Sequence, residues 1–168
     1  MKSSYRNSGN SAIASGVIGF LAFGFLITVL IMHPDNFILM IRFHDGGVIF
    51  QFLLMIPFVF ALHKLSQKCS PNMNKTTLVT GITMICLVIL FLLLIFPKIV
   101  ADTLYMCPQG IFGVWLIGVN RQLSGLFPSG LRWFGMIVGS GLVLVGIFPV
   151  GYSIFVDTIL LRIPARIN

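Results

Sequence analysis

The residue types that bind metal ions or carry protons are concentrated in one short stretch, MHPDNFILMIRFHDGG, at residues 32–47. It holds two of the three histidines and two of the four acidic residues of the chain: His33, Asp35, His44 and Asp45. Imidazole and carboxylate groups are suitable ligands for zinc and similar divalent ions. With Asp102, which comes from a second polar segment, these residues could form a metal site or a site for proton transfer.

A structural interpretation accounts for the same stretch without any site. Neither histidine has a second ligand four residues away, the spacing that places two ligands on one helical face. HPDN, residues 33–36, is typical of a turn that ends a helix. FILMIRF, residues 37–43, then lies in the membrane interface, where Arg42 extends toward lipid phosphates. Asp45 caps the next helix, because its carboxylate accepts hydrogen bonds from the free N–H groups there.

We favour this structural interpretation and expect no catalytic residue, no bound metal and no cofactor. Gln51 is a further polar residue of interest, because its amide is expected to form a hydrogen bond to a neighbouring helix. The residues kept as candidates for binding a ligand or a proton are His33, Asp35, Arg42, His44, Asp45, Gln51 and Asp102.

The composition predicts an integral membrane protein. Of 168 residues, 57% are hydrophobic and 9% are charged, whereas about 25% of the residues in soluble domains are charged. The net charge is +7, but the Lys and Arg residues are scattered singly, so we expect the lipid bilayer rather than nucleic acid as the partner. The three cysteines show neither a CxxC motif nor zinc-ligand spacing.

Apolar blocks of membrane-spanning length predict an all-α helical bundle that forms a single membrane domain, residues 1–168. A helix needs about 20 apolar residues to cross the hydrocarbon layer. The first block is too long for the apolar core of a signal peptide, so we expect an uncleaved first span. The fourth block is short and contains Pro108 and Gln109. The five predicted spans are residues 12–32, 46–65, 76–96, 104–119 and 131–155, and the alternative is four spans with a re-entrant fourth segment.

The distribution of basic residues predicts a cytoplasmic N-terminus in a bacterial inner membrane. Seven Lys and Arg residues fall inside and four outside, whether the chain has four spans or five. Five spans are favoured because residues 120–130 resemble a tight polar turn between two helices. Five spans also place all four aspartates on the outer side.

The turn and its flanking helices, GVWLIGVNRQLSGLFPSGLRWFG at residues 113–135, resemble a domain-of-unknown-function family of bacterial multi-pass membrane proteins. Members of that family tend to be longer, with a further helix after the equivalent of residues 131–155. The resemblance therefore implies that this chain is a shortened member. It implies no activity and no catalytic residues.

Three functions remain open from the sequence. The first is a small polytopic membrane protein without catalysis that acts by helix packing with itself or with a membrane partner protein. The small-residue pairs Ala12/Gly16, Ser15/Gly19 and Gly135/Gly139 would allow close helix contacts, within one chain or between copies. The second function is a carrier or channel for a small neutral or hydrophobic solute, for which a polar cavity at mid-depth would be evidence. The third is a membrane enzyme that uses the outer His and Asp residues, which requires those residues to converge.

Overall fold

The computed structural model describes residues 2–32, 36–69, 75–95, 97, 103–123 and 128–160. These residues form five helices and no strands: α1 (Lys2–Met32), α2 (Phe37–Cys69), α3 (Lys75–Ile95), α4 (Met106–Gln122) and α5 (Ser129–Leu160). Four of the helices, all except α4, are long and apolar enough to cross a membrane. The structure confirms the predicted all-α chain, with four helices that could cross a membrane, but it does not confirm a fifth span.

Helix α2 begins nine residues earlier than the sequence predicts. The carbonyl of Asn36 accepts hydrogen bonds from the N–H groups of Leu39 and Met40, so the helix begins directly after Asn36. Residues 37–43 are therefore the first two turns of α2, and Asp45 lies in its interior. The prediction of an N-terminal cap at Asp45 is therefore wrong, whereas the position of residues 37–43 in the membrane interface stays a prediction. Tertiary packing outweighs local signals here, because Gly47 lies in close contact with Ala22 of α1 and the helix runs through it.

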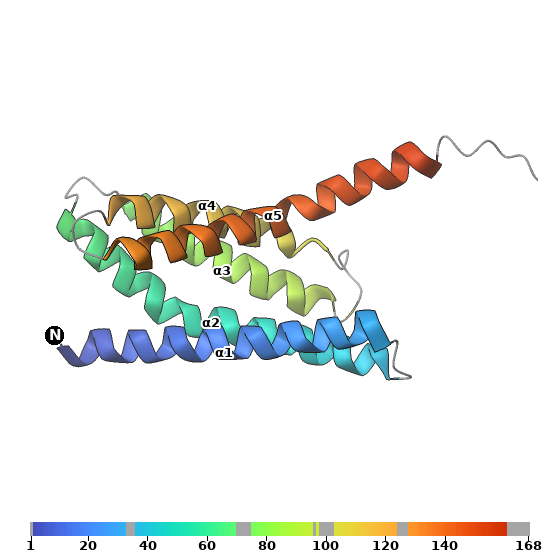
Figure 1. The fold of residues 1–168 in the computed structure, drawn as a ribbon, viewed down its shortest axis with the longest axis horizontal. Coiled ribbons are helices and arrows are strands. Elements are labelled where there is room, and N and C mark those ends of the chain that lie inside the picture. The colour runs from blue at the N-terminus through green and yellow to red at the C-terminus, as the bar shows by residue number, and fades with distance from the viewer. Residues whose placement is uncertain are drawn as a thin grey trace, which may run out of the picture.

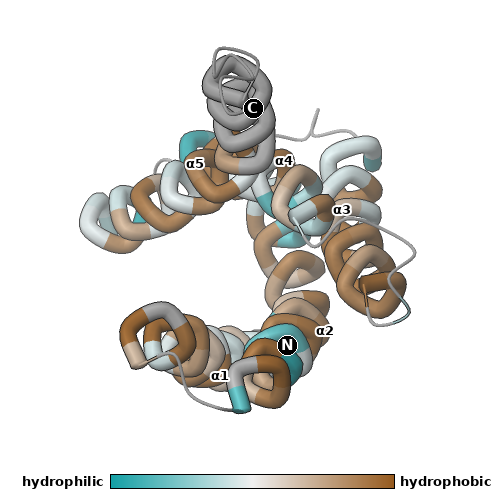
Figure 2. Tube along the Cα trace, turned by 90° about the vertical axis from the view of Figure 1, so that its right-hand side faces the viewer, coloured by the Kyte–Doolittle hydropathy of each residue, from teal (hydrophilic) through white to brown (hydrophobic). Residues whose placement is uncertain are grey.

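The helices follow one another up and down along a common direction (Figure 1). The most extensive contacts join α1 to α2 and α4 to α5, and α3 packs between α2 and α4. Among the described residues, α1 and α5 do not contact each other. Seen end-on, the two helix pairs therefore lie apart on one side of the bundle and are joined through α3 on the other (Figure 2).

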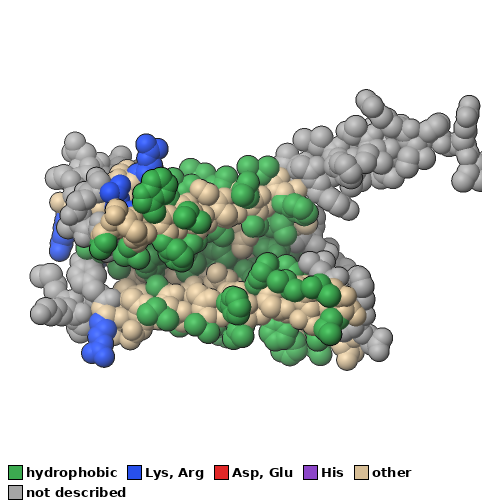
Figure 3. All heavy atoms as spheres, in the orientation of Figure 1, with side chains coloured by type: hydrophobic (Ala, Val, Ile, Leu, Met, Phe, Trp, Pro, Cys, Tyr) green, Lys and Arg blue, Asp and Glu red, His purple; other side chains and the backbone are tan. Residues whose placement is uncertain are grey.

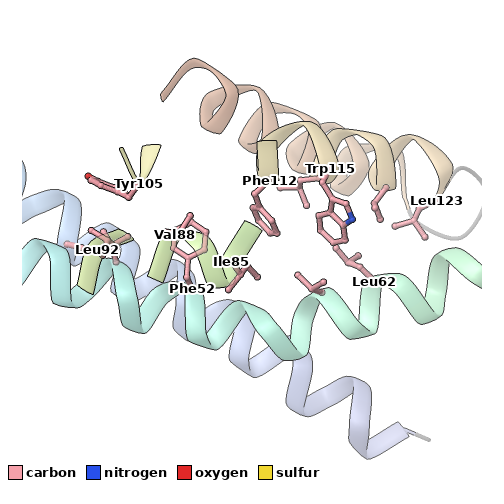
Figure 4. Packing of buried hydrophobic residues seen from close by; sticks show 14 residues of the cluster. Phe52, Leu62, Ile85, Val88, Leu92, Tyr105, Phe112, Trp115 and Leu123 are labelled. Carbon is pink, nitrogen blue, oxygen red and sulfur yellow. The ribbon is translucent and has the colours of Figure 1, made fainter. Parts of the chain in front are cut away.

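The apolar core lies where α2, α3 and α4 meet. Phe52 of α2 packs edge-to-face against Phe112 of α4, with ring centroids 6.0 Å apart, and Phe112 stacks on Trp115 at 5.2 Å (Figure 4). The side of α3 that faces them contributes Ile85, Val88 and Leu92, each completely buried. The indole Nε1 of Trp115 donates a hydrogen bond to the carbonyl oxygen of Thr77 at 2.6 Å, which joins α4 to α3.

Helix α4 is the most enclosed helix of the described part. Nine of its 17 residues are buried, including Gln109 and Asn120. A helix surrounded by protein need not be as apolar as one surrounded by lipid, which explains why the α4 sequence has the weakest signal for a membrane span.

Glycines bring the helices of each pair close together. A Cβ atom added to Gly139 of α5 would lie 2.8 Å from the carbonyl oxygen of Gly113 on α4. Between α1 and α2, Ser15 donates a hydrogen bond to the Gln51 carbonyl at 3.0 Å, and the backbone of Gly19 lies close to the Gln51 side chain. Two of the predicted small-residue pairs thus make contacts within the chain. In the third pair, Gly16 has open space beside it.

Candidate binding groove

The structure brings together only part of the predicted outer cluster. His33, Asp35 and Asp102 lie outside the described residues. His44 and Asp45 are adjacent on α2 and buried, with 9% and 8% of their surfaces exposed. The described residues include no group of three His, Cys, Asp or Glu side chains that could hold a metal ion.

His44 joins α2 to α1. Its Nδ1 atom lies 3.0 Å from the carbonyl oxygen of Ala22. Because a carbonyl oxygen only accepts hydrogen bonds, Nδ1 carries the hydrogen and donates it. Close by, a Cβ atom on Gly47 would be 2.9 Å from the Ala22 Cβ, so the two helices are in close contact here. The role that the geometry assigns to His44 is therefore to hold two helices together.

Asp45 affects the pKa of Tyr105, a residue that is not among the predicted candidates. Tyr105 lies in the turn before α4, outside the four candidate spans, and is 8% exposed. Burial raises the pKa of the Tyr105 hydroxyl to about 12, and the negative charge of Asp45 adds to this increase. The two residues are far apart in the sequence, and no spacing rule could have paired them.

The two remaining candidates on α2 differ in their surroundings. Arg42 is exposed near the start of the helix. Gln51 is half-buried, and a Cβ atom on Gly19 would be 2.6 Å from its Nε2 atom. The hydrogen bond that joins Gln51 to α1 is made by its backbone carbonyl, which accepts from Ser15, and not by the side-chain amide for which it was expected. The side-chain amide makes no hydrogen bond within the described part of the chain.

Gln51 also lines a cavity of about 510 Å³ that separates the two helix pairs. The walls come from four helices, at residues 12–16, 51–62, 116–120 and 131–138. The cavity occupies the half of the bundle in which α1 begins and α2 ends. Figure 3 shows recessed hydrophobic side chains between the two halves of the molecule. We call this cavity the inter-pair groove.

The walls of the inter-pair groove are mostly hydrophobic. Among the lining residues are Met55, Phe58, Leu62, Leu116, Phe134 and Val138. The hydroxyl of Ser15 is already bonded to Gln51, and Nδ2 of Asn120 donates to the Leu116 carbonyl at 2.9 Å. The free hydrogen-bonding capacity is therefore small and comes from the amide of Gln51 and the amide oxygen of Asn120.

Comparison with protein-family models, with curated proteins and with solved structures gives no match to this chain. The resemblance to a bacterial membrane family therefore stays a prediction. The groove itself could not be found from spacing in the sequence, because its walls are brought together by four helices and each segment alone is an ordinary apolar stretch.

Proposed function

We propose that this chain binds a small hydrophobic solute that enters the inter-pair groove sideways from the lipid bilayer. The observation that carries the proposal is an apolar cavity between helix pairs whose outer members, α1 and α5, do not touch in the described part. Its volume of about 510 Å³ lies within the range of small-molecule sites, about 300–1,000 Å³. The groove is apolar and is not the polar cavity named above as evidence for a carrier, so the proposal concerns the binding of a hydrophobic solute.

A polar or ionic solute is less well supported. None of the residues that line the groove is charged, and the polar groups of Ser15 and Asn120 are largely engaged with backbone carbonyls. Ion and proton pathways in membranes use ionisable residues inside the helix bundle. The enzyme hypothesis depends on His33, Asp35 and Asp102, and it gains no support from His44, whose Nδ1 is used in helix packing.

The proposed threading has five spans, with the N-terminus in the cytoplasm of a bacterial cell and α4 as the fourth crossing. At a rise of about 1.5 Å per residue, the 17 residues of α4 measure about 25 Å, slightly less than the hydrocarbon layer of about 30 Å. The burial of α4 between α3 and α5 supports a crossing, because protein shields its less apolar residues from lipid.

Helix packing with a second copy or a membrane partner is the second candidate function. It is supported by glycines with open space beside them on the two outer helices, Gly24 on α1 and Gly141 on α5. Such positions allow another helix to approach closely.

Photo-crosslinking tests the groove proposal. The purified chain, reconstituted in lipid nanodiscs, is exposed to a long-chain alcohol that carries a diazirine, and the labelled residues are mapped by mass spectrometry. We expect labels on Met55, Phe58 and Phe134, which line the groove.

Two matched substitutions on α1 serve as the test and its control. Gly16→Leu adds a side chain at a groove position where nothing lies within 4 Å of a Cβ atom, and should remove the labels. Gly24→Leu is equally unhindered but lies outside the groove, and should leave them in place. Labels spread evenly over the outer faces of α1 and α5, unchanged by Gly16→Leu, would refute the proposal.

A further inference from the structure

Basic residues lie at one end of the helices that form the inter-pair groove. Three of the helices that line it, α2, α4 and α5, each carry a basic residue within two positions of their last groove residue at that end: Lys64, Arg121 and Arg132. Helix α1 adds Arg6, about 9 Å before its first groove residue at about 1.5 Å per residue. Figure 3 shows Lys and Arg side chains gathered at the end where α1 begins.

Arg132 is held at the mouth of the groove. Its Nε atom donates a hydrogen bond to the backbone carbonyl of Asn120 at 3.3 Å, near the C-terminal end of α4, and the side chain is half-buried. Its two terminal amino groups make no hydrogen bond within the described residues. Lys64 and Arg121 are exposed at the same end of the bundle, on α2 and α4. The end of the bundle at which Arg132 lies therefore carries several cationic donors that an anionic group could reach.

No acidic side chain that the structure describes offsets this charge; the side chains of residues 149–160 on α5 are outside this description. Asp45 is the only carboxylate among the described side chains, and it lies about 28 Å from Lys64 along α2, at about 1.5 Å per residue. The groove thus combines an apolar interior with a positively charged mouth, which matches an amphipathic anion.

The depth of the groove matches one leaflet of a bilayer. On α2 it extends from Leu62 to Gln51, about 16 Å along the helix at about 1.5 Å per residue. This is close to half of the hydrocarbon layer of about 30 Å. A ligand with its charge at the mouth would therefore place an acyl chain along the groove as far as the middle of the membrane.

We propose that the inter-pair groove binds one acyl chain of an anionic phospholipid from the leaflet at the basic end, with the lipid phosphate at Lys64, Arg121 and Arg132. This inference rests on the proposed function and names its ligand class. The second acyl chain stays in the surrounding bilayer. Arg contributes bidentate hydrogen bonds to phosphate, and Lys contributes a point charge.

Native mass spectrometry tests the lipid class. The full chain is reconstituted with equal amounts of phosphatidylglycerol and phosphatidylcholine, extracted in a mild detergent, and analysed for retained lipid. We expect one phosphatidylglycerol per chain, in clear excess over phosphatidylcholine. The double variant Lys64→Gln with Arg121→Gln should lower this excess on the order of five-fold for each charge removed. Arg42→Gln, which removes a charge near the other end of α2, should leave it unchanged.

The two glycine variants separate this inference from the proposed function. Gly16→Leu should abolish retention of both lipids, and Gly24→Leu should retain phosphatidylglycerol as the unmodified chain does. Equal retention of the two lipids, lost in Gly16→Leu, would overturn the anionic ligand while keeping the groove as a binding site. Retention that is unchanged in Gly16→Leu would overturn both proposals. A lipid-free dimer would overturn both as well, and would assign the groove to a second copy of the chain.

Discussion

The backbones of Gly110 and Gly146 touch across the contact between α4 and α5. A Cβ atom added to Gly110 would lie 2.8 Å from the Cα atom of Gly146, closer than real Cβ contacts allow. Two backbones cannot yield as a flexible side chain can, so the separation of these helices depends on the absence of a side chain at both positions. This contact holds α5 against α4 and so positions one wall of the inter-pair groove.

Gly110→Ala should therefore destabilise the chain. Overpacking of a filled interior costs about 1–3 kcal/mol, and the gain in helix propensity from Gly to Ala, about 1 kcal/mol, offsets part of it. Gly118→Ala on the same helix is the control, because nothing lies within 4 Å of its Cβ position. Thermal unfolding in detergent should show a lower midpoint for Gly110→Ala and an equal or higher one for Gly118→Ala. Equal midpoints for the two variants would mean that the helices are not in contact at Gly110.

Trp115→Phe should lower stability by about 1–2 kcal/mol, because it removes the hydrogen bond that the indole donates to Thr77. Trp133→Phe should have little effect, since Trp133 is 63% exposed on α5. The chain has two tryptophans, so each variant also isolates the fluorescence of the other. We expect the emission of Trp115, measured in Trp133→Phe, to be insensitive to brominated lipids. Strong quenching there would place Trp115 at the lipid surface.

Stability should fall above pH 10 because of Tyr105. The hydroxyl has an ordinary pKa of 10.0 in the unfolded chain and about 12 in the folded one. Between these values the unfolded state has lost the proton and the folded state has kept it, so unfolding becomes easier as the pH rises. The contribution is fully present below pH 10 and is lost as the pH rises through about 12. Tyr105→Phe should flatten this part of the stability profile.

Asp45→Asn should lower the pKa of Tyr105, because it removes the negative charge that helps to raise it. Burial is the larger cause and remains, so the pKa should stay above 10. Ultraviolet titration of tyrosinate in a chain with Tyr5 and Tyr152 replaced by Phe would measure the change. An unchanged pKa would show that Asp45 does not act on Tyr105.

The threading can be tested with reporter fusions. Fusions after Asp35 and after Lys98 should report an external location, and fusions after Asn74 and after Ser124 should report the cytoplasm. An external signal after Ser124, with the other three as expected, would contradict five spans and remove α4 as a crossing.

The sequence was sufficient to predict the helical membrane character, because long apolar blocks have few other stable structures. It failed where tertiary contacts outweighed local signals. The predicted second span began at residue 46, yet Gly47 packs against Ala22 within a helix that already begins at Phe37. The cap assigned to Asp45 followed from that misplaced boundary.

The groove and the partner of Asp45 could not be predicted, for a related reason. Both depend on which helices become neighbours, and apolar helices of similar length give no indication of their order in space. The basic residues at this end of the bundle were used only to orient the chain, because charge counts do not reveal that Lys64, Arg121 and Arg132 lie within two positions of residues that line one groove. His33, Asp35 and Asp102 lie outside the described residues, so the outer cluster stays a prediction.

The spacing of two charges on α2 bears on the thickness of membrane that suits this protein. Arg42 and Lys64 are about 33 Å apart along the helix at about 1.5 Å per residue, a close match to a hydrocarbon layer of about 30 Å. A thinner membrane would make α2 tilt, and α1 would tilt with it, because Ser11 and Ser15 bond to carbonyls of α2. Hydrophobic mismatch would then tilt α1 and α2 together, and membrane thickness would change the orientation of one entire wall of the groove.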